Sequence, residues 1–228
     1  MDPTWRTAYR SFYYDQLPED LPDIVLDPSL TALLVIDLQV CYLPQIPGAD
    51  PVEWERWAPF RSRLEAIVLP NTKILLEKFR GLSRDIMFAR IACLTSDGRD
   101  RSLSHARLGF NNLLLPQHSP DSQILPQVAP LLGETVICKT TDSALTGTAL
   151  RLMLTNLGIR NVVVCGIFTD QCVSSTVRSL ADESFNVIVV DDACAAATQD
   201  LHCAELTIIN NIYCQVLTTQ ETLSSLLK

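Results

Sequence analysis

The stretch "NVVVCGIFTDQCVSSTVRSLADESFNVIVV", residues 161–190, decides the fold of this chain. Branched apolar residues at 161–166 predict a buried strand, and those at 186–191 predict a second one. Between them, residues 172–184 have the length and composition of a helix. A strand, a helix and another strand in this order form a βαβ unit, whose two strands run parallel. Cys172 falls where the first strand gives way to the helix.

The same alternation continues on both sides of this unit. Further strands are expected at 31–37, 85–94, 134–139 and 214–218, and helices within 52–82, 121–131, 146–157, 199–211 and 218–228. Thr219 is expected to cap the last helix. The sequence therefore predicts an α/β fold, a mainly parallel sheet with helices on both faces, as in a Rossmann-like three-layer sandwich. Residues 1–29 are proline-rich and predict an N-terminal arm that wraps its own domain or a partner subunit, and residues 30–228 form the main domain.

Composition argues against several classes of protein. The net charge is −8 at pH 7 and the basic residues are dispersed, which argues against binding to nucleic acid or to an acidic membrane surface. No apolar run reaches the roughly 18 residues of a membrane span, and the first residues lack the features of a secretory signal. We therefore expect a soluble cytoplasmic protein. The eight cysteines include no C-x-x-C pair, so neither a zinc knuckle nor a redox dithiol is expected.

The residues that follow the strands carry the candidate chemistry, because parallel sheets place functional groups at the carboxyl ends of their strands. Neither G-x-G-x-x-G nor G-x-x-x-x-G-K-[ST] occurs, which argues against nucleotide binding. Instead, Asp37, Lys139 and Cys172 end or follow three of the strands. Alone, they read as a turn cap, a strand-end lysine and a small apolar residue. Together they predict a carboxylate, an ammonium and a thiol at one edge, with a helix N-terminus that favours the thiolate.

Two segments that contain these residues resemble the isochorismatase-like cysteine hydrolases. They are "ALLVIDLQ", residues 32–39, and "KTTDSALTGTALRLMLTNLGIRNVVVCGIFTDQCVSSTVRSLADESFNVIVVDDACAA", residues 139–196. The ordered aspartate, lysine and G-x-x-T-x-x-C-V motif carry the resemblance, which covers residues 30–218. Together with the apolar content and the aromatic arm, it implies a homo-oligomer, either a dimer or a tetramer.

The resemblance also implies the chemistry of the site. Its catalytic triad is Asp37, Lys139 and Cys172, and a non-proline cis peptide bond precedes the cysteine at Ile167–Phe168. This bond turns the backbone N–H groups of Phe168 and Cys172 toward one point, where they form an oxyanion hole. The implied reaction begins when Asp37 takes the thiol proton and the sulfur attacks a carbonyl carbon. Ammonia or an amine then leaves, and water hydrolyses the remaining thioester.

The family includes isochorismatases, nicotinamidases and amidases of ureido compounds. Isochorismatases proper act on a vinyl ether and lack the nucleophilic cysteine, so Cys172 favours an amidohydrolase of a small amide or ureido compound. Nicotinamidases carry a D-x-H-x-x-H metal site after the first aspartate, whereas "DPVEWERWAPFRSRLEAI", residues 50–67, contains no histidine. We therefore expect neither a metal nor another cofactor. The alternatives are a nicotinamidase-like carboxamide hydrolase, a non-catalytic scaffold on the same fold, and a redox or dinucleotide protein.

Further residues near the predicted triad are candidates for substrate binding. Tyr42 matches an aromatic position of the family, and Gln171 and Asn111 offer amide groups that suit a small polar substrate. For Asn111, turn chemistry is the alternative. Arg107 lies in an irregular segment with two other arginines, which either hold a substrate carboxylate or form a solvated rim. His105, in the same segment, is a further candidate for the wall of the site.

Overall fold

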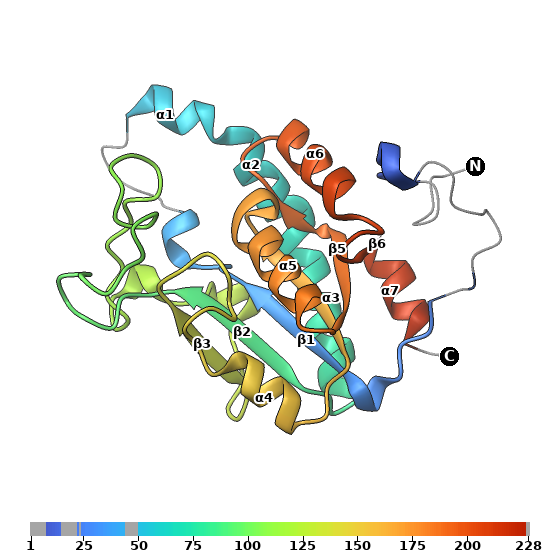
Figure 1. The fold of residues 1–228 in the computed structure, drawn as a ribbon. Coiled ribbons are helices and arrows are strands. Elements are labelled where there is room, and N and C mark those ends of the chain that lie inside the picture. Colours follow the sequence, from blue (N-terminus) through green and yellow to red (C-terminus); the bar gives the residue numbers. More distant parts are fainter. Residues whose placement is uncertain (1–7, 15–21, 23, 44–49, 227–228) are drawn as a thin grey trace.

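Six parallel strands form one sheet in the computed structural model, which describes residues 8–14, 22, 24–43 and 50–226 (Figure 1). The strands are β1 (Thr31–Ile36), β2 (Ile86–Ile91), β3 (Thr135–Lys139), β4 (Asn161–Ile167), β5 (Asn186–Ala195) and β6 (Gln215–Leu217). Their spatial order is β3-β2-β1-β4-β5-β6, and every neighbouring pair is parallel. The predicted α/β fold with a parallel sheet is confirmed.

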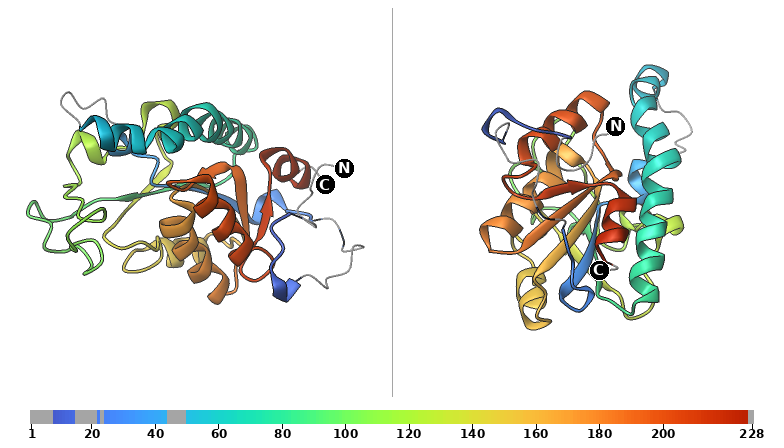
Figure 2. Two further views of the ribbon diagram at one scale, coloured as in Figure 1. Left: turned by 90° about the horizontal axis from the view of Figure 1, so that it is seen from above. Right: turned by 90° about the vertical axis from the view of Figure 1, so that its right-hand side faces the viewer.

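Helices cover both faces of this sheet (Figures 1 and 2). On one face lie α1 (Pro51–Arg56), α2 (Ala58–Arg63), α3 (Leu69–Gly81) and α7 (Thr219–Ser225). On the other face lie α4 (Leu150–Asn156), α5 (Ser174–Asp182) and α6 (Gln199–Ile209). A π-helical turn, Leu64–Val68, joins α2 to α3. This layered arrangement buries both faces of the sheet, as the continuous apolar runs of its strands require.

The two central strands, β1 and β4, approach each other closely at their carboxyl ends. Both strands are buried along their whole lengths, and the register places Ile36 beside Gly166. Gly166 has a φ of +123°, and a Cβ at this position would lie 2.0 Å from the carbonyl oxygen of Ile36. Only glycine fits this position. The contact brings Asp37, which follows β1, next to the turn that follows β4.

The segment predicted as a helix at 121–131 contains none. The structure has two short 3-10 turns there, Pro120–Ser122 and Pro126–Val128, and an irregular chain between and after them. Prolines explain the difference, because Pro126 and Pro130 have no N–H group to continue a helix. Prolines therefore interrupt this segment too often for a continuous α-helix to form.

The last helix is capped by Thr218, one residue before the predicted cap. The Thr218 hydroxyl accepts a hydrogen bond from the Glu221 N–H at 3.2 Å, and the Glu221 carboxylate accepts one from the Thr218 N–H at 2.8 Å. These reciprocal bonds form a capping box. Thr219 instead donates its hydroxyl to Asp192 at 2.8 Å, so it ties α7 to β5.

The described parts of the N-terminal arm contact the arm's own domain. The Tyr9 hydroxyl donates to Asp191 on β5 at 2.8 Å, and the Asn210 side chain donates to the Ala8 carbonyl at 3.0 Å. The division into an arm at 1–29 and a domain at 30–228 stays a prediction.

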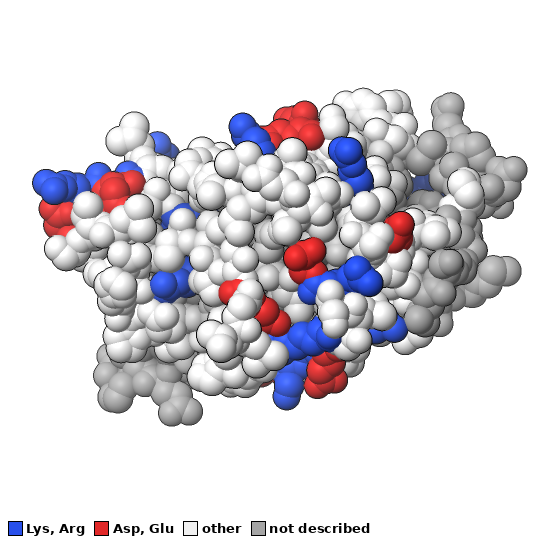
Figure 3. Space-filling model, turned by 90° about the horizontal axis from the view of Figure 1, so that it is seen from below, with Lys and Arg blue, Asp and Glu red and all other residues white. Residues whose placement is uncertain are grey.

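Two features are relevant to possible partners: the distribution of charge on the surface and the hydrophobicity of the helices. The face drawn in Figure 3 carries basic and acidic side chains in small groups of both signs, with wide uncharged areas between them. Over the described part of the chain, no helix combines the length and the hydrophobicity needed to cross a bilayer.

Candidate active site

Three side chains from three strand ends meet at the carboxyl edge of the sheet. Lys139 is the last residue of β3, and its ammonium nitrogen lies 2.8 Å from Oδ2 of Asp37. The same nitrogen donates to Sγ of Cys172 at 3.2 Å and to the Thr141 carbonyl at 3.2 Å. Asp37 and Lys139 are 1% exposed and Cys172 is 3% exposed. The structure thus brings together the three residues that the sequence suggested as a triad.

Asp37 is held by a tight turn directly after β1. It is a non-glycine residue with a φ of +52°, and its N–H group donates to the Ala89 carbonyl on β2 at 2.9 Å. The buried side chain of Gln39 secures the turn, because it donates to the carbonyls of Ile91 and Ser122 and accepts from the Ile91 N–H, each at 2.9 Å. The carboxylate is therefore fixed by backbone geometry as well as by Lys139.

Cys172 lies in a π-helical turn, Thr169–Val173, between β4 and α5. The peptide bond that precedes this turn, Ile167–Phe168, is cis. The Gln171 N–H donates to the Phe168 carbonyl at 3.0 Å, which closes the turn around the cysteine. The oxyanion hole suggested for the N–H groups of Phe168 and Cys172 stays a prediction.

The start of this turn is anchored by a buried histidine. His202, on α6, places Nδ1 2.8 Å from the Thr169 hydroxyl and Nε2 2.8 Å from Oδ1 of Asp191. Its side chain is fully buried. These hydrogen bonds connect the turn that contains Cys172 to α6 and β5, so His202 holds this turn in position.

Burial and the charge of nearby carboxylates both disfavour ionisation of the Cys172 sulfur. Burial, followed by the nearby carboxylate of Asp37, raises the pKa of Cys172 well above its ordinary value, although Lys139 opposes the shift. Burial also raises the pKa of Asp37, against the attraction of Lys139. For Lys139, burial favours the neutral amine, but Asp37 and Cys172 outweigh it and raise the pKa of the ammonium. The thiolate that the helix N-terminus is expected to favour is thus opposed by burial and by Asp37, and it stays a prediction.

A second carboxylate beside the sulfur was missed by the sequence analysis. Oδ1 of Asp142 lies 3.7 Å from Sγ of Cys172 and 2.9 Å from Nε2 of His105. The hydrogen bond from His105 is the main reason that the pKa of Asp142 is lowered, although burial opposes this. In "KTTDSAL", Asp142 has the features of an ordinary turn residue, and no signal in the sequence links it to a histidine 37 positions away.

Cys172 lines a narrow cavity with a volume of about 10 Å³. Its walls include three of the four predicted substrate-binding residues, Tyr42, Asn111 and Gln171, together with His105 and Asp142. The cavity also borders a cluster of aromatic side chains.

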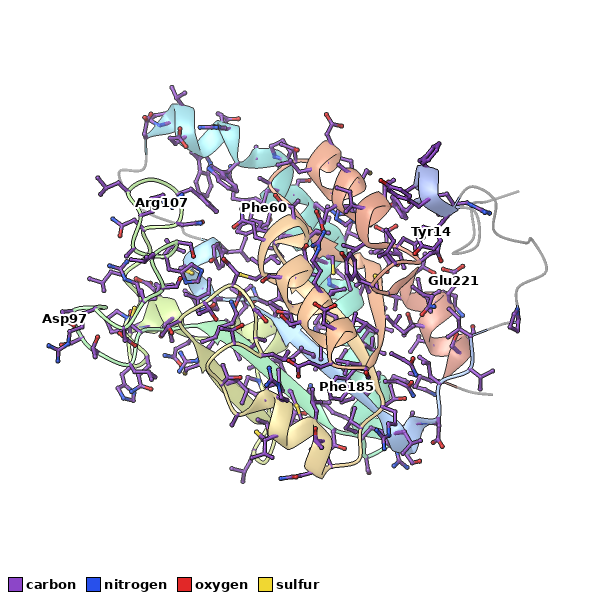
Figure 4. All side chains as sticks on the ribbon, viewed as in Figure 1. Tyr14, Phe60, Asp97, Arg107, Phe185 and Glu221 are labelled. Carbon is purple, nitrogen blue, oxygen red and sulfur yellow. The ribbon has the colours of Figure 1, made fainter. Side chains whose placement is uncertain are left out.

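The neighbouring aromatic cavity has a volume of about 250 Å³. It shares Tyr42, Phe110 and Phe168 with the narrow cavity and adds Trp57 and Phe60. Ring centroids are 5.2 Å apart for Trp57 and Phe110, and 4.9 Å apart for Phe60 and Phe168. Phe60, labelled in Figure 4, is the buried residue of α2. The Cys172 sulfur therefore lies beside a space that is lined mainly by flat apolar groups.

The fourth predicted substrate-binding residue, Arg107, is exposed on the loop between β2 and β3 (Figure 4). Among the described residues, it lines neither the cavity that contains Cys172 nor the aromatic cavity. Arg101 is held within its own loop by the carbonyls of Gly98, His105 and Leu113. The geometry gives no support to Arg107 as the residue that binds a substrate carboxylate, and this role stays a prediction.

The sequence predicts that the site holds no metal ion. Within the described ranges, no group of three or more histidine, cysteine, aspartate or glutamate side chains has an arrangement that could hold a metal ion. The expectation that the site uses no cofactor stays a prediction.

Comparisons with known proteins match nearly the whole domain. A family model described as the isochorismatase domain matches residues 31–221. The uncharacterized isochorismatase family protein YddQ of Bacillus subtilis is 33% identical over 202 residues, covering 83% of this chain and 97% of YddQ. The crystal structure of a cysteine hydrolase from Pseudomonas syringae superposes with a TM-score of 0.73 at 21% identity, covering 91% of this chain and 98% of that one.

Two further relatives have names that state a reaction. Streptothricin hydrolase of Streptomyces noursei is 28% identical over 173 residues, which cover 76% of this chain and 51% of that protein. Ureidoacrylate amidohydrolase RutB of Pantoea ananatis is 26% identical over 179 residues, which cover 73% of this chain and 69% of that protein.

Proposed function

The chain belongs to the isochorismatase family of hydrolases, and from this premise we propose that it is a cysteine-dependent amidohydrolase. Its substrate is a small amide or ureido compound, whose C–N bond it cleaves with release of ammonia or an amine. The contact of Cys172, Lys139 and Asp37 beside a narrow cavity carries the proposal. The name of RutB, a ureidoacrylate amidohydrolase, supports an amidohydrolase, and that of streptothricin hydrolase supports a hydrolase.

In the acylation step, Asp37 accepts the Cys172 proton while the sulfur attacks the carbonyl carbon of the substrate. The raised pKa of Asp37 suits this role, because a base with a higher proton affinity takes a thiol proton more readily. The negative charge passes to the carbonyl oxygen, which the N–H groups of Phe168 and Cys172 stabilise, each worth about 3–4 kcal/mol in comparable sites. Asp37 then protonates the leaving nitrogen as the C–N bond breaks.

The second half of the reaction frees the sulfur. A thioester, or a thiocarbamate when the substrate is a ureido compound, now joins the acyl group to Cys172. Asp37 takes a proton from water, and the oxygen attacks the acyl carbon. The C–S bond breaks, the acid leaves, and the proton returns to the sulfur. Lys139 stabilises negative charge on Asp37 or on the sulfur throughout, because its ammonium contacts both groups.

The aromatic cavity suggests the remainder of the substrate. Its volume of about 250 Å³ accommodates a ring or a short apolar chain next to the reacting carbonyl. Tyr42, Phe110 and Phe168 line both cavities, and the narrow one has a volume of only about 10 Å³, so the aromatic cavity would hold the remainder of the substrate while only its carbonyl group reaches Cys172. A nicotinamidase-like aromatic carboxamide hydrolase is therefore the second candidate, and it uses the same triad.

The experiment is a screen for ammonia or amine release across ureido compounds, carboxamides and carbamoyl-amino acids. The proposal expects turnover of at least one class by the wild-type protein and none by Cys172→Ala. Cys172→Ala retaining the activity would contradict it. A Leu152→Ala variant, which trims an exposed side chain on α4, controls for handling and purity.

The proposal includes a homo-oligomer located in the cytoplasm. Several apolar side chains on the outer surface of the α1–α3 layer are exposed, including Val52 at 74% and Ile74 at 43%. Burial of such groups against a second copy is favourable. Light scattering on the purified protein distinguishes a monomer from a dimer or tetramer, and cell fractionation tests the location.

A further inference from the structure

The carboxylate of Asp142 stands beside the nucleophile in a position that needs an explanation. It lies 3.7 Å from Sγ of Cys172, and its lowered pKa keeps it negatively charged. The Asp142 side chain remains 32% exposed, whereas that of its partner His105 is 5% exposed. Asp142 thus presents a partly exposed carboxylate beside the buried sulfur of Cys172.

The negative charge of Asp142 disfavours ionisation of the Cys172 thiol. A carboxylate so close to the sulfur opposes the formation of a thiolate, and Asp142 contributes to the raised pKa of Cys172. A purely structural hydrogen-bond acceptor for His105 need not be charged, since an asparagine oxygen would accept the same bond. The negative charge therefore calls for a partner that arrives with the substrate.

A third cavity, lined by polar side chains, also borders Asp142. Its volume is about 360 Å³, and it shares Asn111, Asp142 and Gln171 with the cavity that contains Cys172. Asp170 adds a second carboxyl group to its wall. Of the described residues lining it, Arg178 is the single lysine or arginine.

Apart from His105, which contacts Asp142 at 2.9 Å, the basic side chains near Asp142 have other partners. The Arg178 guanidinium pairs with Glu205 at 2.8 Å. The Lys139 ammonium is shared between Asp37 and Cys172. His105 approaches Asp142 from the protein interior through Nε2, and its Nδ1 has no hydrogen-bond partner among the described residues. The outward side of Asp142 is therefore available to a ligand.

We propose that Asp142 selects substrates by their charge. The preferred substrate carries a cationic nitrogen next to the scissile amide, and amides with a carboxylate at that position are rejected. This inference rests on the proposed function, because the same sulfur performs the chemistry. A bound cation neutralises Asp142 and thereby removes one obstacle to ionisation of the thiol. Recognition of the substrate and activation of the nucleophile then occur together.

The test uses probes that react with the sulfur whether or not any amide is turned over. Aminoethyl, ethyl and sulfonatoethyl methanethiosulfonate are cationic, neutral and anionic, and each forms a mixed disulfide with a thiolate and releases methanesulfinate. Rates at Cys172 are read from peptide mass spectra and divided by the rates of the same reagents with a small free thiol. The wild-type protein should react in the order cation, neutral, anion, with about tenfold between the first and the last or more.

Three variants separate the charge of Asp142 from other causes. Asp142→Asn keeps an acceptor for His105 but removes the charge, so the order should collapse to within about twofold. His105→Gln keeps the charge of Asp142, so the order should persist. Asp97→Asn removes one negative charge from the exposed outer loop (Figure 4) and should leave the order unchanged. No preference in the wild-type protein, or a preference that survives in Asp142→Asn, would overturn the inference.

An amide series of matched shape then separates this inference from the proposed function. Amides that carry an amine, a hydroxyl or a carboxylate at the same position should be hydrolysed with kcat/KM falling in that order. If no amide is hydrolysed while the thiol reagents keep their Asp142-dependent order, the proposed function fails and the charge selection stands. If the carboxylate amide is hydrolysed best, the charge selection fails and the amidohydrolase stands.

Discussion

Lys139 holds together two groups that compete for one proton. Its ammonium contacts the Asp37 carboxylate and the Cys172 sulfur in a buried site, so its own charge is compensated only while Asp37 is ionised. A buried pair of this kind contributes little net stability, but removal of one member leaves an uncompensated charge. The pair is therefore better explained by chemistry than by folding.

Replacement of this lysine should destabilise the protein and abolish turnover. Lys139→Met leaves the Asp37 carboxylate buried without a cation, at an expected loss of about 3–5 kcal/mol in the free energy of unfolding. In the double variant Asp37→Asn/Lys139→Met neither charge remains, so most of the stability should return while activity stays absent. Urea denaturation measures the first quantity and the amide screen the second. Full activity in Lys139→Met would contradict the role of the ammonium.

The pH dependence of alkylation tests the state of the thiol. Because the pKa of Cys172 is raised, iodoacetamide should modify it slowly up to about pH 8.5, the ordinary value for a thiol, and faster only above it. Asp142→Asn removes a repulsive charge and should move the rise to lower pH. Peptide mass spectra distinguish Cys172 from the other seven cysteines. A wild-type thiol that titrates below pH 8 would contradict this electrostatic description.

Among single residues, the sequence predicted those whose position follows from a strand end. Asp37, Lys139 and Cys172 end or follow strands of a parallel sheet, so their meeting follows from topology. The proximity of His105 and Asp142 does not, because it depends on how the irregular loop folds over the edge of the sheet. No periodicity records that path.

At the scale of elements, the close contact of β1 and β4 sets the geometry of the site. The strand, helix and strand pattern of residues 161–190 predicted the neighbouring elements, since short apolar runs and helical segments alternate there without ambiguity. The π-helical turn at Thr169–Val173 was not predicted. Its sequence is compatible with an ordinary helix start, whereas the wider turn is accompanied by tertiary contacts of Thr169 with His202 and of Phe168 with Phe60.

A methyl group at the contact between β1 and β4 should be tolerated poorly. Gly166→Ala places Cβ 2.0 Å from the Ile36 carbonyl oxygen at a φ of +123°, and we expect a loss of about 3 kcal/mol or more in the free energy of unfolding. Gly158→Ala is the matched control, because Gly158 also has a positive φ, +72°, but no atom lies within 4 Å of the added Cβ. Its loss should be about 1–2 kcal/mol. Similar losses in the two variants would refute the steric argument.

At the scale of the whole molecule, Asp191 connects four parts of the chain. Its carboxylate accepts hydrogen bonds from Tyr9 in the arm and Arg63 on α2, and it pairs with His202 on α6. His202 in turn contacts Thr169 at the start of the cysteine turn. The sequence could not predict this network, because its members are brought together only by the finished fold.

The network should contribute stability that depends on pH. Burial opposes ionisation of Asp191, but hydrogen bonds from His202 and Tyr9 outweigh it and lower the pKa of the carboxyl group. A lowered pKa in the folded state contributes stability above the ordinary value of 3.8, and this contribution is lost as the pH falls through the folded value. Asp191→Asn should be less stable at pH 7 by about 1–3 kcal/mol and should lose less stability on acidification.

Denaturation curves at pH 7, 5, 4 and 3 test this prediction. Asp97→Asn, which alters an exposed carboxyl group, serves as the control and should follow the wild-type pH profile. Parallel profiles of Asp191→Asn and the wild-type protein would assign the acid sensitivity to other groups.

The covalent intermediate on Cys172 is the most direct test of the proposed hydrolysis. An amide that the protein turns over is mixed with it, the reaction is stopped with acid within the first turnovers, and the intact mass and the Cys172 peptide are measured. We predict an added acyl mass on Cys172 that hydroxylamine removes and that Cys172→Ala never acquires. Turnover by Cys172→Ala, or an acyl group carried by a different residue, would contradict the account.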